Sequence, residues 1–208
     1  MDGKGGPAGL QAKEDVVILA PIVLGGRSIR LEPLTLDHAP ALFHHASAEV
    51  FEWMVDWPLD ASFAAYLEWE RRGLEIPGSL LFAIVLQATG EPIGSTAFFD
   101  VRPEHRAIEI GRSWIGKAHQ GTAANPESKL LLLRHAFETL GAVRVQLKTD
   151  SRNLHSQRAI EKLGAVREGT LRNYQTRADG RPRDTVMYSI TAEEWPAVRA
   201  GLERRLAR

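Results

Sequence analysis

The stretch that decides the fold runs from Gln120 to Ala165 and reads QGTAANPESKLLLLRHAFETLGAVRVQLKTDSRNLHSQRAIEKLGA. It predicts a loop of small residues at 120–125, an amphipathic helix, a strand at 143–149 and a second helix that ends at 163–165. Exposed amides at a helix start, with an open strand edge beside them, are suited to holding a ligand that carries phosphate groups.

The first helix of this stretch has the clearest expected boundaries in the chain. Asn125 is a favourable N-cap residue, Pro126 fits the first helical position, and Glu127 suits the positive end of the helix dipole. Gly141 is expected to end the helix. The apolar stripe consists of Leu130, Leu133, Phe137 and Leu140.

The rest of the chain alternates between strand and helix patterns, which predicts a mixed α/β domain with helices on both faces of a sheet. Residues 1–15 are rich in glycine and other small residues and are expected to form a disordered tail, with a single domain over 16–208. Expected strands are 22–24, 27–34, 80–87, 91–100, 107–115, 169–175 and 185–190, and further helices are expected at 35–46, 62–73 and 193–206.

Composition excludes several classes of protein. The 208 residues include 26 basic and 26 acidic ones, and this balance gives no support to a nucleic-acid or anionic-membrane partner. The chain has no cysteine, which excludes a disulfide scaffold, a cysteine-based zinc site and a cysteine nucleophile. No segment has the length and apolarity of a membrane span or the basic start of a signal peptide, so a cytoplasmic protein is expected.

The loop, the strand and the Asn153-x-x-Ser156 helix start together resemble the coenzyme A site of the GNAT superfamily of N-acetyltransferases. The resemblance extends from about Arg27 to Trp195. Residues 183–189 look like the late strand of the RimJ/RimL-like branch, which acetylates the N-termini of ribosomal proteins. The family loop reads Gln/Arg-x-x-Gly-x-Gly/Ala, and this chain departs from it with Ala123 and Asn125 at two glycine positions.

The resemblance implies a central, mostly antiparallel sheet that splays between two parallel strands, here 107–115 and 143–149. It implies acetyl-CoA as co-substrate, with the pantetheine arm lying between those strands and a free backbone N–H around Ser113 to Ile115 directed at the thioester oxygen. The alternative for the loop at 120–125 is an ordinary strand-to-helix turn with good capping and no bound phosphate. The residues implied to bind the cofactor are Ile115, Gln120, Gly121, Thr122, Ala123, Ala124, Asn125, Asn153 and Ser156.

Two residues are candidates for catalysis. Glu109 resembles the general base of some family members, and burial of its carboxylate would raise its pKa. The alternative is a structural carboxylate paired with Arg112 or another cation. Ser156 would hydrogen-bond the departing thiolate, and the alternative is ordinary capping of the helix by Asn153 and Ser156.

The acceptor side is the least defined. Trp53, Asp56 and Trp57 would form an aromatic wall with one acid for a cationic amine, and Tyr174 and Arg172 are weaker candidates for the same cleft. The alternative places the two tryptophans in the core. His44-His45 and His135 show no metal-ligand partners near them in the sequence, so we interpret them as structural and expect no metal.

The sequence therefore predicts an N-acetyltransferase that transfers acetyl from acetyl-CoA directly to a primary amine in a ternary complex. The acceptor is a protein or peptide N-terminus or a small-molecule amine, and a homodimer is left open. Two alternatives remain: a noncatalytic acyl-CoA-binding or interaction module on the same fold, and an unrelated α/β domain in which the motifs are only caps.

Overall fold

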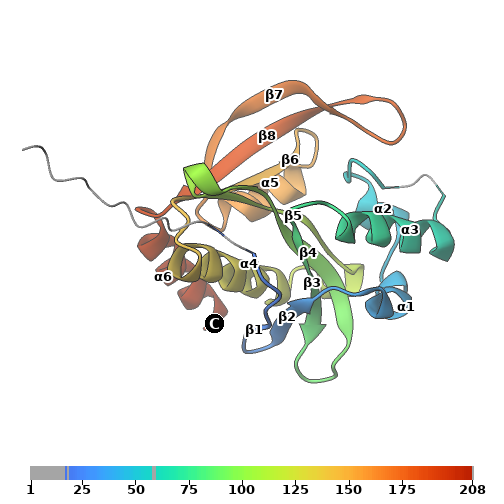
Figure 1. The fold of residues 1–208 in the computed structure, drawn as a ribbon, viewed down its shortest axis with the longest axis horizontal. Helices are drawn as coiled ribbons and strands as arrows, with labels where there is room; N and C mark the ends of the chain where they lie inside the picture. The colour runs from blue at the N-terminus through green and yellow to red at the C-terminus, as the bar shows by residue number, and fades with distance from the viewer. Residues whose placement is uncertain (1–16, 18, 58–59, 208) are drawn as a thin grey trace, which may run out of the picture.

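A computed structural model describes residues 17, 19–57 and 60–207 (Figure 1). The tail expected at 1–15 lies outside the described residues. An eight-stranded sheet forms the centre, in the order β1-β2-β3-β4-β5-β6-β8-β7. The strands are β1 (Leu24–Gly25), β2 (Ile29–Pro33), β3 (Leu80–Leu86), β4 (Pro92–Arg102), β5 (Ala107–Ile115), β6 (Arg144–Asp150), β7 (Val166–Thr176) and β8 (Pro182–Thr191).

Every neighbouring pair in the sheet is antiparallel except β5 and β6, which are parallel. Longer helices are α3 (Phe63–Leu74), α4 (Ala124–Arg134), α5 (Leu154–Glu161) and α6 (Trp195–Leu206). Short ones are η1 (Leu36–His38), α1 (Ala39–Phe43), α2 (Ala48–Phe51), η2 (Pro103–His105), η3 (Lys117–His119) and the π-turn η4 (His135–Thr139). This is the expected mixed α/β architecture.

Two apolar cores lie on opposite faces of the sheet because alternate residues of a strand point to opposite sides. One core joins α4, α5 and α6 to the sheet through residues such as Leu132, Ile160 and Leu202. The other joins α1 and α3 to the sheet through residues such as Leu42 and Trp69. Figure 1 shows the two groups of helices apart, with the β7–β8 hairpin extending beyond the rest of the sheet.

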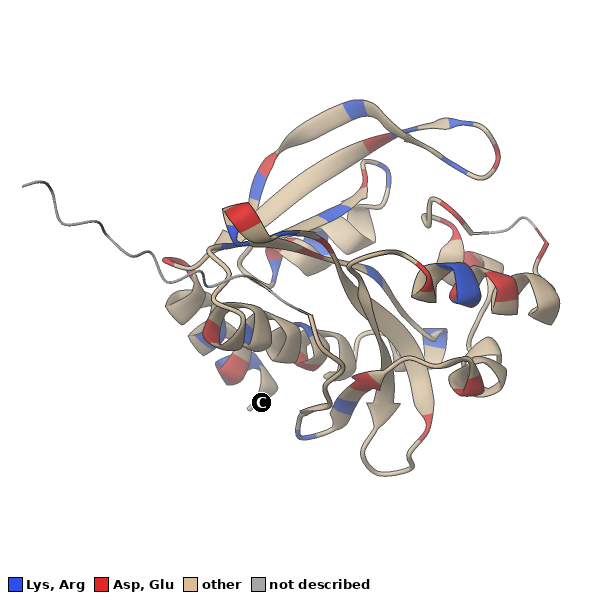
Figure 2. Ribbon diagram, in the orientation of Figure 1, with Lys and Arg blue, Asp and Glu red and all other residues tan. Residues whose placement is uncertain are grey.

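The chain has equal numbers of acidic and basic residues. Figure 2 shows basic and acidic positions interspersed along the β7–β8 hairpin. None of the helices in the described part of the chain has the length and apolar character needed to cross a bilayer.

Candidate functional site

The loop before α4 presents its backbone to solvent, as a phosphate site requires. Gly121, Thr122 and Ala123 are exposed, and Gly121 has φ +77°, a conformation that favours glycine. A Cβ built on Gly121 meets no atom within 4 Å. Gln120 ties the loop to the end of β5, because its Nε2 donates to the Ile115 carbonyl at 3.1 Å.

The start of α4 differs from the expected one. The helix begins at Ala124, so Ala123 rather than Asn125 is the N-cap, and Pro126 lies in the third helical position. No side-chain cap hydrogen bond is made at Ala123 within the described part of the chain, and the Thr122 hydroxyl accepts from the Ala124 amide at 3.3 Å. The Glu127 carboxylate turns away from the loop and accepts from the backbone amide and the hydroxyl of Ser28.

Beside this loop, β5 and β6 separate. Their parallel ladder covers three residue pairs, from Ala107 with Arg144 to Glu109 with Gln146, and stops there. Beyond it, β5 continues to Ile115 and β6 to Asp150. Past the ladder, the facing edges of the two strands are not paired with each other, so their backbone groups are available to an extended ligand.

A β-bulge lies on the β5 side of this gap. Arg112 and Ser113 together face Thr96 of β4, and Arg112 has φ +44°. The Arg112 side chain fixes the bulge from the α3 face: its guanidinium carbon lies 3.8 Å from the Trp69 ring centre, and Nη1 donates to Asp56 at 2.9 Å.

The opposite face of the bulge carries a buried lysine that the sequence analysis did not single out. Lys129 of α4 donates from Nζ to Thr96 Oγ1 at 3.1 Å and also to Ser113 Oγ. Burial lowers the pKa of Lys129 to about 7. The available sequence signal was its position four residues before Leu133, on the apolar stripe of the helix.

Glu109 lies at the last paired position before the strands separate, and its exposed fraction is 0%. Its Oε1 is 3.0 Å from Lys148 Nζ, and its Oε2 accepts from Gln146 Nε2 at 2.9 Å. Burial raises the pKa of Glu109, and Lys148 and Gln146 oppose that rise. The cation beside Glu109 is thus Lys148, whereas Arg112 is paired with Asp56.

Asn153 and Ser156 begin α5, which follows the open end of β6. Asn153 Oδ1 accepts from the Ser156 amide at 2.9 Å, so the capping expected of Asn153 is present. The Ser156 side chain is not used in this cap, and Ser156 is half-buried. Its hydroxyl therefore remains a candidate for contact with a ligand.

The expected wall of Trp53, Asp56 and Trp57 is divided between separate sets of contacts. Trp57 stacks on Phe51 with ring centres 3.8 Å apart and packs against the second core, as the alternative expected. Asp56 forms an ion pair with Arg112. Trp53 instead lies near Arg152 and Arg177, at 5.2 and 5.9 Å from the guanidinium carbons to its ring. Tyr174 is exposed, and Lys148 Nζ lies 5.7 Å from its ring centre.

A buried carboxylate that the sequence analysis missed connects the acceptor-side segments. Asp150, at the end of β6, is fully buried and pairs with Arg152 at 2.8 Å and with Arg177 at 3.5 Å. Hydrogen bonds to Arg152 hold the pKa of Asp150 below its usual range against the raising effect of burial. Its position directly after a buried strand was the available sequence signal.

Arg177 also carries this network to the α2–α3 connection. Its Nη2 donates to the Glu52 carbonyl, and the Ala178 amide donates to the Val55 carbonyl at 2.9 Å. The segment at 52–57 is therefore attached to the tip of the β7–β8 hairpin.

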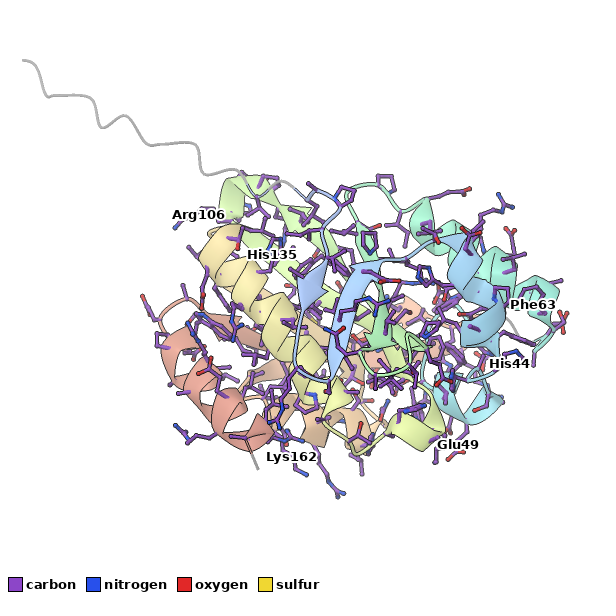
Figure 3. All side chains as sticks on the ribbon, turned by 90° about the horizontal axis from the view of Figure 1, so that it is seen from below. His44, Glu49, Phe63, Arg106, His135 and Lys162 are labelled. Carbon is purple, nitrogen blue, oxygen red and sulfur yellow. The ribbon has the colours of Figure 1, made fainter. Side chains whose placement is uncertain are left out.

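His135 and His45 have different surroundings. His135 is buried in the π-turn (labelled in Figure 3), and burial lowers its pKa, in keeping with a structural role. His45 differs from the expectation, because Glu91 and His119 lie beside it. These partners are 46 and 74 residues away in the sequence, so spacing along the chain gave no sign of them.

Comparison with known proteins identifies the family. The acetyltransferase (GNAT) domain family matches residues 28–166, and the chain therefore belongs to the GNAT acetyltransferases. The uncharacterized N-acetyltransferase p20 of Bacillus licheniformis is 31% identical over 55% of this chain, and the match spans 63% of p20. YdaF of Bacillus subtilis, named provisionally as a ribosomal N-acetyltransferase, is 25% identical over 79% of this chain and 90% of its own.

Solved structures agree with this assignment. A protein from T. thermophilus, provisionally described as an acetyltransferase, is 44% identical and has a TM-score of 0.86 over 90% of this chain and 98% of its own. Mycobacterium smegmatis RimJ, solved with CoA-disulfide, has a TM-score of 0.72 over 88% of this chain and 91% of its own, and its 22% identity shows the shared fold alone. The RimJ/RimL-like resemblance is consistent with these relatives.

Proposed function

We propose that this protein transfers an acetyl group from acetyl-CoA to a primary amine, by direct attack in a ternary complex. The observation that carries the proposal is the gap between β5 and β6, which opens beside the exposed loop at 121–123 that precedes α4. An extended acyl-pantetheine arm fits such a gap as an additional strand, while phosphates suit the helix start.

On the cofactor side, the loop from Gln120 to Asn125 would bind the pyrophosphate through backbone amides. Gly121 keeps side chains away from that surface, and Ala123 adds only a methyl group. Asn153 would face the pantetheine arm, and the Ile115 backbone would lie near its reactive end. The bulge at Arg112 and Ser113 would hold the nearby β5 amides toward the thioester oxygen.

Acetyl transfer forms a carbon–nitrogen bond, breaks the thioester carbon–sulfur bond and removes one proton from the amine. Glu109 would accept that proton as its pKa is raised by burial, and Lys148 would lie between Glu109 and the solvent-exposed Tyr174. Ser156 would donate a hydrogen bond to the departing thiolate. Because direct attack forms no acyl-enzyme, the proposed mechanism needs no cysteine nucleophile.

The acceptor amine would enter between the hairpin and the segment at 52–57. Trp53 and Tyr174 are the candidates that lie outside the second core. Trp57 would support that entrance from within the core, and Asp56 would act through Arg112. A peptide N-terminus or a small amine both match this description.

Binding of coenzyme A tests the first half of the proposal. Saturating coenzyme A should raise the melting temperature, since ligand at about 100 times its Kd stabilises the native state by about 2.7 kcal/mol. Gly121→Glu should abolish the shift by placing a carboxylate at the phosphate loop. Gly78→Glu is the matched control, because Gly78 has a similar φ of +68° and open space around its Cα.

Turnover tests the second half. Release of free thiol from acetyl-CoA in the presence of an amine panel should be faster than hydrolysis without amine. Binding of coenzyme A without turnover on any amine would favour the noncatalytic module. A flat titration and no thermal shift in the wild type would contradict the cofactor assignment itself.

A further inference from the structure

Three side chains from separate segments converge at a place that the acetyl-transfer proposal does not use. His45 follows α1, Glu91 lies in the β3–β4 turn, and His119 ends η3. One potential metal-binding atom of each lies within 4.8 Å of the others. His45 Nε2 is 3.0 Å from Glu91 Oε1, and the two imidazole rings are edge to face at 5.3 Å between centres.

The backbone around His45 and His119 is held in place. A Cβ added to Gly116 would come 2.7 Å from the His45 Cβ, so the glycine permits His45 to pack against the chain there. The His119 amide donates to the Gly116 carbonyl at 2.9 Å, and the His119 carbonyl accepts from the Thr122 hydroxyl at 2.7 Å. Two of the three side chains are therefore carried by a constrained turn or packed against it.

The third side chain comes from an equally short connection. The Glu91 amide donates to Thr89 Oγ1 at 3.2 Å, and the Leu86 amide donates to the Glu91 carbonyl at 2.9 Å. The Glu91 side chain is 46% exposed and that of His45 is 16% exposed. Solvent therefore reaches the cluster, and an ion can enter it without unfolding of the core.

Two imidazoles and one carboxylate are a donor set that Zn²⁺ prefers. Ligand bonds of about 2.0–2.1 Å in a tetrahedral site place the ligand atoms roughly 3.3 Å apart. The His45–Glu91 pair already has about this separation, and rotation of side chains closes the remainder. A water molecule would complete the coordination.

We propose that His45, Glu91 and His119 form a binding site for a divalent transition-metal ion, with Zn²⁺ as the best chemical match. The ion would link the end of α1, the β3–β4 turn and the connection from β5 to α4. Its effect is to stabilise that connection, from which the loop at 120–125 continues. The site does not depend on the proposed acetyl transfer.

The experiment uses the full chain without a histidine tag, stripped of metal. Titration calorimetry with zinc chloride should show one ion per chain, and the melting temperature should rise in parallel. His45→Gln and His119→Gln should each weaken binding by more than about 10-fold, since even changes to residues that only orient ligands cost 10–100-fold. His44→Gln is the matched control, because His44 is the exposed neighbour of His45 (labelled in Figure 3) and should bind as the wild type does.

Co²⁺ provides an independent readout, since its visible absorption distinguishes four-coordinate nitrogen and oxygen ligation from the hydrated ion. Glu91→Gln, an exposed change, keeps the test valid if His45→Gln does not fold, and it should also weaken binding. The proposal is overturned if the wild type binds no Zn²⁺. It is equally overturned if binding persists in the His45→Gln, His119→Gln double variant, or if His44→Gln removes it.

Discussion

Lys129 buries an ammonium group between α4 and the sheet, where its partners are the hydroxyls of Thr96 and Ser113, and no ion pair of Lys129 is found among the described residues. Such burial favours the neutral amine, which explains the lowered pKa. The two hydroxyls also hydrogen-bond each other at 2.7 Å, so they keep a partner if the lysine is removed. This residue is therefore a suitable test of how burial sets stability.

We predict that Lys129→Met stabilises the protein most below pH 7. In the wild type, the pKa is about 7 in the folded state and 10.5 in the unfolded reference. Between these values the unfolded state binds more protons, so wild-type stability rises with pH by up to about 1.4 kcal/mol per unit. The advantage of the variant should therefore shrink from pH 7 to pH 10 in urea unfolding curves.

Lys162→Met is the matched control for that measurement. Lys162 is an exposed lysine at the end of α5 (labelled in Figure 3). An equal pH-dependent difference in both variants would assign the effect to net charge and contradict a special role for burial at Lys129. A constant difference for Lys129→Met would do the same.

Kinetic measurements should distinguish the proposed roles of Ser156 and Asn153. Ser156→Ala is expected to lower kcat more than it weakens acetyl-CoA binding, because its hydroxyl is proposed to act on the departing sulfur. Asn153→Ala should weaken cofactor binding and also reduce stability by about 1 kcal/mol, because it removes the cap on the Ser156 amide. Steady-state kinetics and unfolding curves measure both, and unchanged kcat in Ser156→Ala would remove Ser156 from catalysis.

Glu109→Gln tests the proposed base. A carboxylate whose pKa is raised by burial accepts a proton only above that pKa, so wild-type kcat should fall as pH decreases through it. The glutamine variant should be slower and should lose that acidic limb. Glu138→Gln, a change to a surface-facing partner of Arg199, is the control and should keep the wild-type profile. Matching pH profiles for wild type and Glu109→Gln would leave Glu109 with a structural role.

Local sequence patterns predicted the roles of some single residues and missed the partners of others. Asn153 as a helix cap follows from short-range chemistry that the sequence displays. The partner of Glu109 was not predictable, because Lys148 and Arg112 are both cations and only the direction of each side chain distinguishes them. Which candidates touch a ligand is still a prediction.

Among the elements, the hairpin and the 52–57 segment should move together. Arg177→Met removes the donor to the Glu52 carbonyl and one partner of buried Asp150, so both segments should loosen. Hydrogen exchange should accelerate at 52–57 and at 174–181, and the KM for the amine should rise. Arg181→Met is the control, since Arg181 is 75% exposed at the same tip. Faster exchange in the hairpin alone would contradict the attachment.

A comparison of expected and observed limits shows which strands and helices the hydrophobic periodicity predicts correctly. The strand expected at 107–115 has those limits in the structure, and the helix expected at 62–73 differs by one residue at each end. The helix expected at 126–140 begins two residues early and changes to a π-turn at His135. Asn125-Pro126 looked like a start, but the helical backbone already begins at Ala124, whose amide donates to the Thr122 hydroxyl.

For the whole molecule, we predict a preference for α-amines over lysine side chains. At pH 7, removing the proton from an amine of pKa ~10.4 costs about 4.6 kcal/mol, against about 1.4 kcal/mol for an α-amine of pKa ~8. A single buried base paired with Lys148 meets the smaller cost more readily. Peptides with a free N-terminus and blocked lysines should therefore react faster than the converse peptides from pH 6 to 9, and faster lysine acetylation throughout would reject the preference.

The overall architecture was predictable because it depends on repeated local patterns and on a family resemblance that covers most of the chain. The sheet with one parallel pair and helices on both faces is confirmed. The convergence of His45, Glu91 and His119 was not predictable, since it arises only when the β3–β4 turn and the end of β5 reach the same place. Long-range packing of this kind has no signature in residue spacing.

We predict that the gap between β5 and β6 makes the ligand-free protein prone to self-association. Beyond the three paired positions, each strand has an edge that another chain could extend, and open edges of this kind promote aggregation. A ligand bound in the gap would cover both strand edges. Preparations stored with coenzyme A should therefore remain dispersed during heating and concentration, when ligand-free preparations begin to associate edge to edge.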